Sequence, residues 1–177
     1  MLIQICGLPG TGKSTLAARL ADRRPVVLLR IDAIEAAMWR NGLTPDQTGV
    51  AAYSVAHSIA LPHLERGHTV VADAVSAVGA ARQGWSGTAE HAGVPLRVIE
   101  TVCPDPVEHR RRVTTVTSDL PGFPLPTWEQ VQTVAERYEP RDDERLVVDT
   151  RRDPEACVQE VLDYLDRTGG GPWCQPR

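Results

Sequence analysis

The residues best suited to chemistry lie near the start of the chain, in the run from Gly7 to Thr15. This run reads Gly-Leu-Pro-Gly-Thr-Gly-Lys-Ser-Thr and matches G-x-x-x-x-G-K-[ST], the pattern of a phosphate-binding loop. Its glycines let backbone N–H groups turn inward around a phosphate chain. The lysine can reach the outer phosphates, and the serine hydroxyl can ligate Mg²⁺. The run therefore predicts a site for ATP and Mg²⁺ built from Gly7, Pro9, Gly10, Thr11, Gly12, Lys13, Ser14 and Thr15, with Ser14 as a metal ligand.

The flanks of this run fit a true phosphate-binding loop. Residues 2–6 are short and apolar, as expected for a buried strand, and Leu16, Ala17 and Leu20 recur at helical spacing after the run. Lys13 is also the only lysine among 19 basic residues. A strand before the loop and a helix after it separate a real site from a chance glycine-rich turn, which is the alternative interpretation.

Two aspartates each follow an apolar run that predicts a strand. Asp32 follows residues 25–31, and Asp73 follows residues 69–72. Because ligands of parallel sheets bind at the carboxyl ends of the strands, both carboxylates are expected near the phosphate loop. Asp73 could join the Mg²⁺ shell or hold an acceptor, and Asp32 could take the proton of an attacking hydroxyl. Either residue could instead cap the following helix, and Glu35 places a capping box at Asp32.

Three consecutive arginines precede a segment rich in proline and glycine, residues 120–126. A flexible flap with arginines at its base could close over ATP, exclude water and stabilise the charge of the transferring phosphate. Since Arg110, Arg111 and Arg112 cannot all point one way, we expect Arg112 or Arg110 to point inward as a catalytic residue. A solvated basic helix face is the alternative.

The five histidines share no metal-ligand spacing, and each is more simply explained by surface exposure or packing. Only His57, together with Tyr53 on the same predicted helix, suggests a wall of an acceptor pocket, which Asp32 and Asp73 could complete.

Five apolar runs, residues 2–6, 25–31, 69–72, 96–102 and 146–148, alternate with helical patterns. This alternation predicts a three-layer α/β fold, a parallel sheet with helices on both faces. We expect a nucleoside-kinase-like strand order of 2-3-1-4-5. Helices are predicted at residues 33–39, 50–66 and 78–92, from 105 and from 153, and at 127–138, with a polar loop at 42–49. One domain should cover residues 1–168, with a lid at about 110–126 and a loose tail at 169–177.

The composition excludes several classes of protein. A chain of 177 residues with 42% hydrophobic and 24% charged residues is typical of one soluble domain. A net charge of −4 argues against a general nucleic-acid binder. No apolar run approaches ~18 residues, so we expect no membrane span, and the first strand argues against a signal peptide. Cys6, Cys103, Cys157 and Cys174 form no C-x-x-C pair, which predicts core thiols and a cytoplasmic location.

Three segments together resemble the chloramphenicol-phosphotransferase-like small kinases: the phosphate loop, residues 30–38 (Arg-Ile-Asp-Ala-Ile-Glu-Ala-Ala-Met) and residues 65–73 (Glu-Arg-Gly-His-Thr-Val-Val-Ala-Asp). Broader relatives are gluconate kinases, shikimate kinases and other compact P-loop phosphotransferases. The resemblance spans residues 2 to about 165. It implies ATP at residues 10–15, Mg²⁺ at Ser14, Asp32 as the base, an arginine-bearing lid, and residues 150–154 beside adenine. Relatives often carry further arginines within the lid, where this chain has Val116 and Asp119.

These observations predict an ATP-dependent O-phosphotransferase that acts on a hydroxyl of a small molecule. The resemblance makes an antibiotic or related natural product, phosphorylated for self-resistance, the leading acceptor class. The first alternative is a kinase of a metabolite, nucleoside or polynucleotide end. The second is a nucleotide-binding regulatory ATPase without an acceptor. Neither a membrane nor a nucleic-acid partner is expected.

Overall fold

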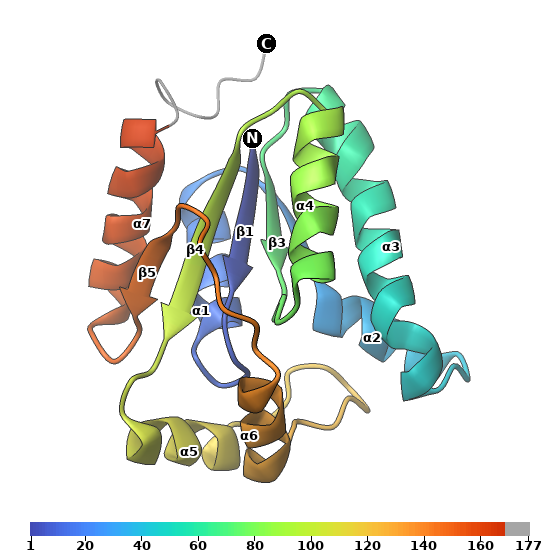
Figure 1. Cartoon of the computed structure of the whole chain (residues 1–177), viewed down its shortest axis with the longest axis vertical. Coiled ribbons are helices and arrows are strands. Elements are labelled where there is room, and N and C mark those ends of the chain that lie inside the picture. Colours follow the sequence, from blue (N-terminus) through green and yellow to red (C-terminus); the bar gives the residue numbers. More distant parts are fainter. Residues whose placement is uncertain (169–177) are drawn as a thin grey trace.

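Five short parallel strands form the centre of the fold (Figure 1). They are β1 (Leu2–Cys6), β2 (Val27–Arg30), β3 (Val70–Asp73), β4 (Leu96–Val102) and β5 (Leu146–Asp149). Their order in the sheet is β2-β3-β1-β4-β5, and every neighbouring pair is parallel. This confirms the α/β class and the strand order expected from the sequence. The structure, a computed structural model, describes residues 1–168; the predicted tail at 169–177 lies outside the described residues.

Seven helices in the described part of the chain surround the sheet. They are α1 (Lys13–Arg23), α2 (Ile31–Arg40), α3 (Pro45–Glu65), α4 (Gly79–His91), α5 (Pro106–Thr115), α6 (Trp128–Glu136) and α7 (Pro154–Thr168). Helices α1 and α7 pack on one face of the sheet, and α3 and α4 on the other. Helices α5 and α6 lie beyond the carboxyl ends of the strands (Figure 1). They therefore stand beside the edge where ligands of such sheets bind.

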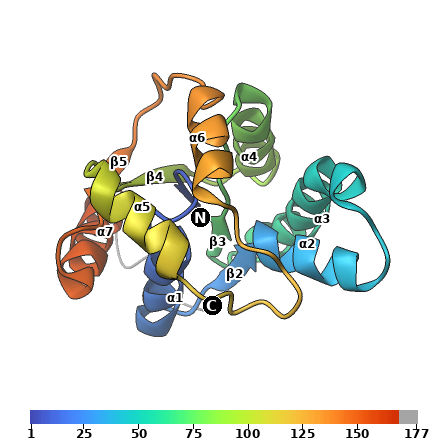
Figure 2. The same ribbon diagram turned by 90° about the horizontal axis from the view of Figure 1, so that it is seen from below.

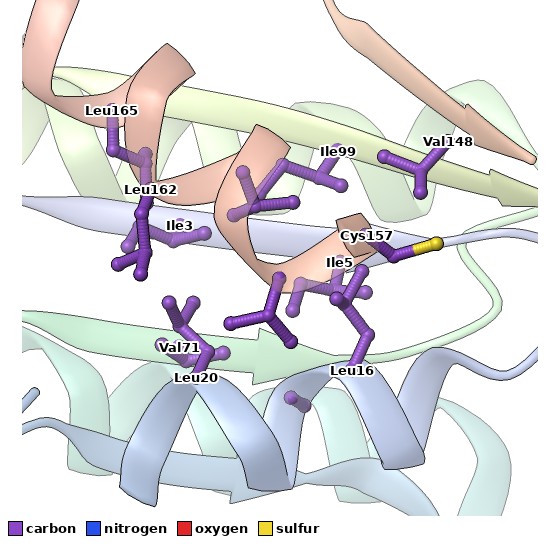
Figure 3. Packing of buried hydrophobic residues seen from close by; sticks show 13 residues of the cluster. Ile3, Ile5, Leu16, Leu20, Val71, Ile99, Val148, Cys157, Leu162 and Leu165 are labelled. Atoms are coloured by element: carbon purple, nitrogen blue, oxygen red, sulfur yellow. The ribbon is translucent and has the colours of Figure 1, made fainter. Parts of the chain in front are cut away.

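The core has two parts because successive side chains of a strand point to opposite faces of the sheet. On β1, Ile3 and Ile5 pack toward α1 and α7, while Leu2 packs toward α3 and α4. Figure 3 shows the first cluster, in which side chains of the two helices meet those of β1, β3, β4 and β5. The second cluster centres on Trp85 of α4, which is fully buried. Packing on both faces holds β1 rigidly, and the phosphate loop follows directly from its end.

Two helix starts differ from the sequence prediction. Helix α3 begins at Pro45, within the residues predicted as a polar loop, because Thr44 and Gln47 form a capping box. The Thr44 N–H donates to Gln47 Oε1 at 2.9 Å. Strand β2 ends at Arg30, so Asp32 lies in the first turn of α2 rather than at a strand end. The capping role considered for Asp32 is wrong, since the N-cap residue of α2 is Arg30 and no side chain caps the helix.

The predicted starts of α5 and α6 are confirmed. The Asp105 carboxylate accepts from the N–H groups of Val107 and Glu108, and Pro106 occupies the first helical position. The Glu108 side chain does not return to the cap, because its carboxylate pairs with Arg111 and Arg112 of α5. Helix α6 begins at a capping box formed by Thr127 and Gln130.

The described cysteines are core thiols, as the sequence predicts. Cys6, Cys103 and Cys157 are buried and free, while Cys174 lies outside the described residues. Within residues 1–168, no helix has both the length and the apolar character that a membrane crossing requires.

Candidate active site

A cavity of about 1350 Å³ opens at the carboxyl ends of the strands. This exceeds the ~300–1,000 Å³ typical of a site for one small ligand, so two molecules can be accommodated together. The phosphate-loop side of the cavity is defined here by Pro9, Gly10, residues 12–16, Ala18, Arg19, Asp73, Arg111, Arg112 and Thr150. The lid side is defined by Leu28, Arg30, Asp32, Trp39, Val75, Asp119 and residues 123–126.

The phosphate loop requires glycine at two positions. Gly7 has φ +133° and Gly10 has φ +80°, a region that favours glycine. A Cβ atom at Gly7 would lie 2.3 Å from the Thr101 carbonyl oxygen, and one at Gly10 would lie 2.5 Å from Val113 Cγ2. Neither approach leaves room for a side chain. The two glycines therefore serve both the loop conformation and its close packing against β4 and α5.

Threonines fasten this loop to the ends of β4 and β5. The Thr11 hydroxyl donates to the Leu8 carbonyl at 2.7 Å and lies 2.8 Å from the Thr101 hydroxyl. The Thr150 hydroxyl donates to the Thr11 carbonyl at 2.8 Å. Since Thr11 and Thr101 are buried, these hydrogen bonds hold the loop in one shape before any ligand arrives.

Lys13 lies at the start of α1 with its ammonium group inside the cavity wall. The Nζ atom donates to the Leu8 carbonyl at 2.9 Å. Burial lowers the pKa of this ammonium group, and the carboxylates of Asp73 and Asp32 oppose that effect. An ammonium carries three N–H donors, so two are available to phosphate oxygens.

Asp73, at the end of β3, faces the phosphate loop. Burial raises the pKa of this carboxyl group, while Lys13, the nearby Ser14 hydroxyl and Arg30 lower it. Its Oδ2 atom is buried without a hydrogen-bond partner. A hydroxyl and an unsatisfied carboxylate oxygen beside a phosphate site are the hard donors that Mg²⁺ takes alongside phosphates and water. Ser14 and Asp73 therefore fit a magnesium site.

Asp32 lines the lid side of the cavity and is partly exposed. Among residues 1–168, its carboxylate takes part in no hydrogen bond and no ion pair. The same carboxylate acts on Glu35, one turn further along α2, whose pKa is raised by burial and by the Asp32 charge. The Asp32 carboxylate thus faces the cavity, and no hydrogen-bond donor or cation of the described residues binds it.

Of the three consecutive arginines of α5, Arg111 and Arg112 line the cavity and Arg110 does not. Arg112 lines the cavity and donates to the Thr150 hydroxyl at 2.9 Å and to the Thr150 carbonyl at 3.0 Å. Its Nε atom also donates to Glu108 at 2.7 Å. Arg110 is exposed and does not line the cavity, so the prediction of an inward role for Arg110 is wrong. The turn of the helix decides this, since residues two apart face different directions.

Tyr53 and His57 do not line the cavity, contrary to the sequence prediction. They pack between α3 and α4 instead. The Tyr53 hydroxyl accepts from the Ser76 N–H at 3.2 Å. The His57 ring lies 4.2 Å from the Trp85 ring, and its Nδ1 atom lies 2.9 Å from the Thr88 hydroxyl. Both residues hold the second core cluster together.

Several residues of the site were missed in the sequence. His109 of α5 is buried, and its Nε2–H donates to the Pro9 carbonyl at 2.7 Å, which ties α5 to the phosphate loop. Thr101 could have been found, because it lies near the carboxyl end of β4, whereas Thr150 was expected beside adenine and not as a link to the loop. Nothing local distinguishes His109. Asp149, at the end of β5, pairs with Arg151 and does not line the cavity.

The connection between α5 and α6, residues 116–127, borders the cavity and is called the lid below; the first part of the lid predicted at about 110–126, up to Thr115, belongs to α5. Figure 2 shows it passing beneath β2 toward α2 before it returns to α6. Phe123 of the lid stacks on Trp39 of α2 with ring centroids 4.7 Å apart. Arg30 Nη1 donates to Asp119 at 2.5 Å. These contacts place the lid over the side of the cavity that lies opposite the phosphate loop.

The parallel sheet, its strand order and the phosphate loop at the end of β1 define a P-loop nucleotide-binding protein with the fold of small kinases. Residues 2–137 match the AAA_33 family, described as an AAA domain, and the chain belongs to this family. No curated protein matches the sequence significantly.

Solved structures share this fold over nearly the whole chain. A presumed kinase from Chloroflexus aurantiacus is 22% identical, with 94% of this chain and 96% of that chain covered and a TM-score of 0.74. A sugar kinase from Janibacter sp. HTCC2649 is 18% identical, with 96% of each chain covered and a TM-score of 0.70. Kti12 from Chaetomium thermophilum, in complex with ADP-AlF3, is 17% identical, with 93% and 97% covered and a TM-score of 0.71. At these identities the likeness establishes the fold, and the narrower resemblance to chloramphenicol phosphotransferases stays a prediction.

Proposed function

We propose that the protein is an ATP-dependent phosphotransferase that moves the γ-phosphate of ATP to a hydroxyl group of a small molecule. The observation that carries this proposal is the unpartnered Asp32 carboxylate, which lines the same cavity as Lys13 and Ser14. A nucleotide site alone would not need a free carboxylate on its opposite wall. The kinase fold of the AAA_33 chain and of its structural neighbours supports the same conclusion.

The phosphate-loop side would bind the triphosphate. Backbone N–H groups of the loop and the start of α1 present positive charge to the phosphates, and Lys13 adds a buried ammonium donor. Ser14 and Asp73 would hold Mg²⁺, which, when bound, would offset charge on the phosphate oxygens. Thr150 and Pro154, which line the cavity, stand where the resemblance expects adenine.

The lid side would bind the acceptor and activate its hydroxyl. The acceptor oxygen forms a new bond to the γ-phosphorus, while the bond between that phosphorus and the β–γ bridging oxygen breaks. ADP leaves with the electron pair of the broken bond. The acceptor proton passes to the Asp32 carboxylate, whose lack of an internal partner leaves it free to accept. The lid, held over α2, would exclude water from the reacting groups.

The acceptor is proposed only as a small hydroxyl compound. The sequence resemblance suggests an antibiotic as the acceptor. None of the neighbours reported above is named for an antibiotic substrate. A polynucleotide end is disfavoured by the net charge of −4. A regulatory ATPase without an acceptor is the alternative outcome of the test, and the complex of the neighbour Kti12 with ADP-AlF3 is a case of nucleotide binding on this fold.

The test compares the parent protein with Asp32→Asn in the presence of MgATP and a panel of hydroxyl compounds, with ADP release and acceptor mass shift as readouts. We expect the variant to lose transfer by roughly 10²–10⁴-fold while it binds MgATP as the parent does. Asp46→Asn is the matched control, because Asp46 is also the second residue of its helix but is exposed and outside the cavity.

Undiminished transfer by Asp32→Asn would remove Asp32 as the base. ADP release that no member of the panel stimulates, together with tight MgATP binding, would favour the regulatory alternative.

A further inference from the structure

The positive charges of the cavity are distributed unevenly. Five basic side chains line the cavity within the described residues: Lys13, Arg19, Arg30, Arg111 and Arg112. Four of them belong to the phosphate-loop side. Arg30 is the only basic residue among those that define the lid side, where Asp32 and Asp119 provide two carboxylates, while Asp73 belongs to the phosphate-loop side. This side of the cavity therefore carries more negative than positive charge.

The guanidinium of Arg30 is already engaged by two of these carboxylates. Arg30 stands opposite Asp73 in the register of β2 and β3, and its Nε atom lies 3.7 Å from Asp73 Oδ2. Its Nη1 atom donates to Asp119 Oδ2 at 2.5 Å. This pairing lowers the pKa of the Asp119 carboxyl group, so the lid carries a negative charge there at neutral pH. An anionic group on an acceptor would have to displace Asp119 to reach this arginine.

Apart from Thr117 of the lid and Gln130 and Thr133 of α6, the remaining surface on the lid side is apolar or aromatic. Trp39 and Phe123 stack on each other, and Leu28, Val75, Pro124 and Leu125 line the same side. Aromatic faces and carboxylates both attract cations and repel anions. The wall therefore suits the carbon skeleton of a neutral or amine-bearing compound.

From this arrangement we infer that Asp119 is a specificity-determining residue and that the acceptor is a hydroxyl compound without an anionic group. The lid carboxylate keeps the one lid-side cation occupied, and it places a like charge in the path of a carboxylate or phosphate on the acceptor. Discrimination of this kind works by penalising the wrong ligand. The inference rests on the proposed function, since it assigns the lid side to the acceptor.

The test uses three open-chain probes with one carbon skeleton: glucitol, glucamine and gluconate. Their affinities are measured by calorimetry in the presence of MgADP, so the comparison does not depend on turnover. We expect the parent to bind gluconate more weakly than either of the other two. Asp119→Asn frees the Arg30 guanidinium and should tighten gluconate binding by about tenfold, as expected for one hydrogen bond to a charged group. The affinity for glucitol should stay unchanged.

Two further variants make the test specific. Asp142→Asn removes an exposed aspartate that does not line the cavity and should leave all three affinities unchanged. The double variant Asp119→Asn/Arg30→Gln should lose the gain in gluconate affinity. A gain caused by a general loosening of the lid would persist in this double variant. The inference is overturned if the parent binds gluconate more tightly than the other two probes. It is also overturned if Asp119→Asn binds gluconate no more tightly than the parent, including the case in which neither protein binds it. Failure of the proposed function is a separate result, namely no phosphate transfer to any hydroxyl compound.

Discussion

The two sides of the cavity are built in different ways. The phosphate-loop side is part of the sheet: Thr11 and Lys13 are 3% and 8% exposed, and hydrogen bonds tie the loop to β4 and β5. The lid side is closed by contacts of one connecting segment, and its main ion pair uses an Asp119 side chain that is 70% exposed. The nucleotide half is thus fixed by the core, whereas the acceptor half depends on a segment that the core does not hold.

This difference has an energetic consequence. An ion pair with an exposed partner contributes about 0.2–1 kcal/mol to stability, so losing the Arg30–Asp119 pair would cost the fold little. The buried hydrogen bonds around Thr11 are costly to break, because each would leave an unsatisfied polar group. We therefore expect changes at the loop to abolish nucleotide binding and changes at the lid to alter acceptor choice or rate.

The largest expected effect comes from Gly10→Ala. The added Cβ atom would approach Val113 Cγ2 to 2.5 Å, and the residue has a φ of +80°, so alanine would strain the loop or displace α5. Strain of about 3 kcal/mol corresponds to a loss of roughly 100-fold in MgATP affinity. Isothermal titration calorimetry measures this loss of MgATP affinity. Gly87→Ala is the control, because no atom lies within 4 Å of its added Cβ, and alanine inside α4 should stabilise the fold slightly. Equal affinity of both variants would contradict the rigid loop.

An intermediate effect is expected from Arg112→Ala. The side chain links α5 to Thr150, whose hydroxyl in turn holds the Thr11 carbonyl of the loop. Loss of this link should weaken MgATP binding by about tenfold. The neighbouring variant Arg110→Ala removes the same charge from an exposed position outside the cavity and should bind as the parent does. A similar loss in both variants would mean that α5 contributes only general positive charge.

The smallest effect concerns Glu108, which accepts hydrogen bonds from Arg111 and Arg112 at the base of the lid. These hydrogen bonds lower the pKa of Glu108 from 4.5 to about 2. Because the folded-state pKa is depressed, the stabilisation is fully present above about pH 4.5 and is lost as the pH falls through about 2. Glu108→Gln should therefore be slightly less stable than the parent at pH 7, and the difference in their free energies of unfolding should shrink toward pH 2. Urea unfolding midpoints of both proteins across this pH range measure that difference. A difference that does not change with pH would contradict the ion pair, and Glu136→Gln, exposed on α6, gives the baseline.

The phosphate-loop side could be predicted from the sequence because its signals are local. Five apolar runs, a glycine-rich loop and a helix start fix where the strands end, and the carboxyl ends of parallel strands must share one edge. Thr44 and Gln47 offered a similar local signal for the start of α3, and it was overlooked.

The lid side could not be predicted because its contacts join distant residues. Arg30 and Asp119 are 89 positions apart, and Arg40 and Pro121 are 81 apart. No periodic pattern links such pairs, since only the packing of α5 and the lid brings them together. The inward role expected for Arg110, Tyr53 and His57 failed for the same reason: which face of a helix meets the cavity depends on how that helix docks.

The most direct test of the account is the affinity of MgATP for the parent and for Lys13→Ala, measured by calorimetry and followed by a transfer assay. Lys13 provides the only ammonium side chain in the chain, and it points from a rigid loop into the cavity. We expect Lys13→Ala to keep its fold, to lose roughly 10²–10³-fold in transfer and to bind MgATP much more weakly. If Lys13→Ala binds MgATP as tightly as the parent and still phosphorylates a hydroxyl compound, the phosphate-loop side is not the nucleotide site and the account is wrong.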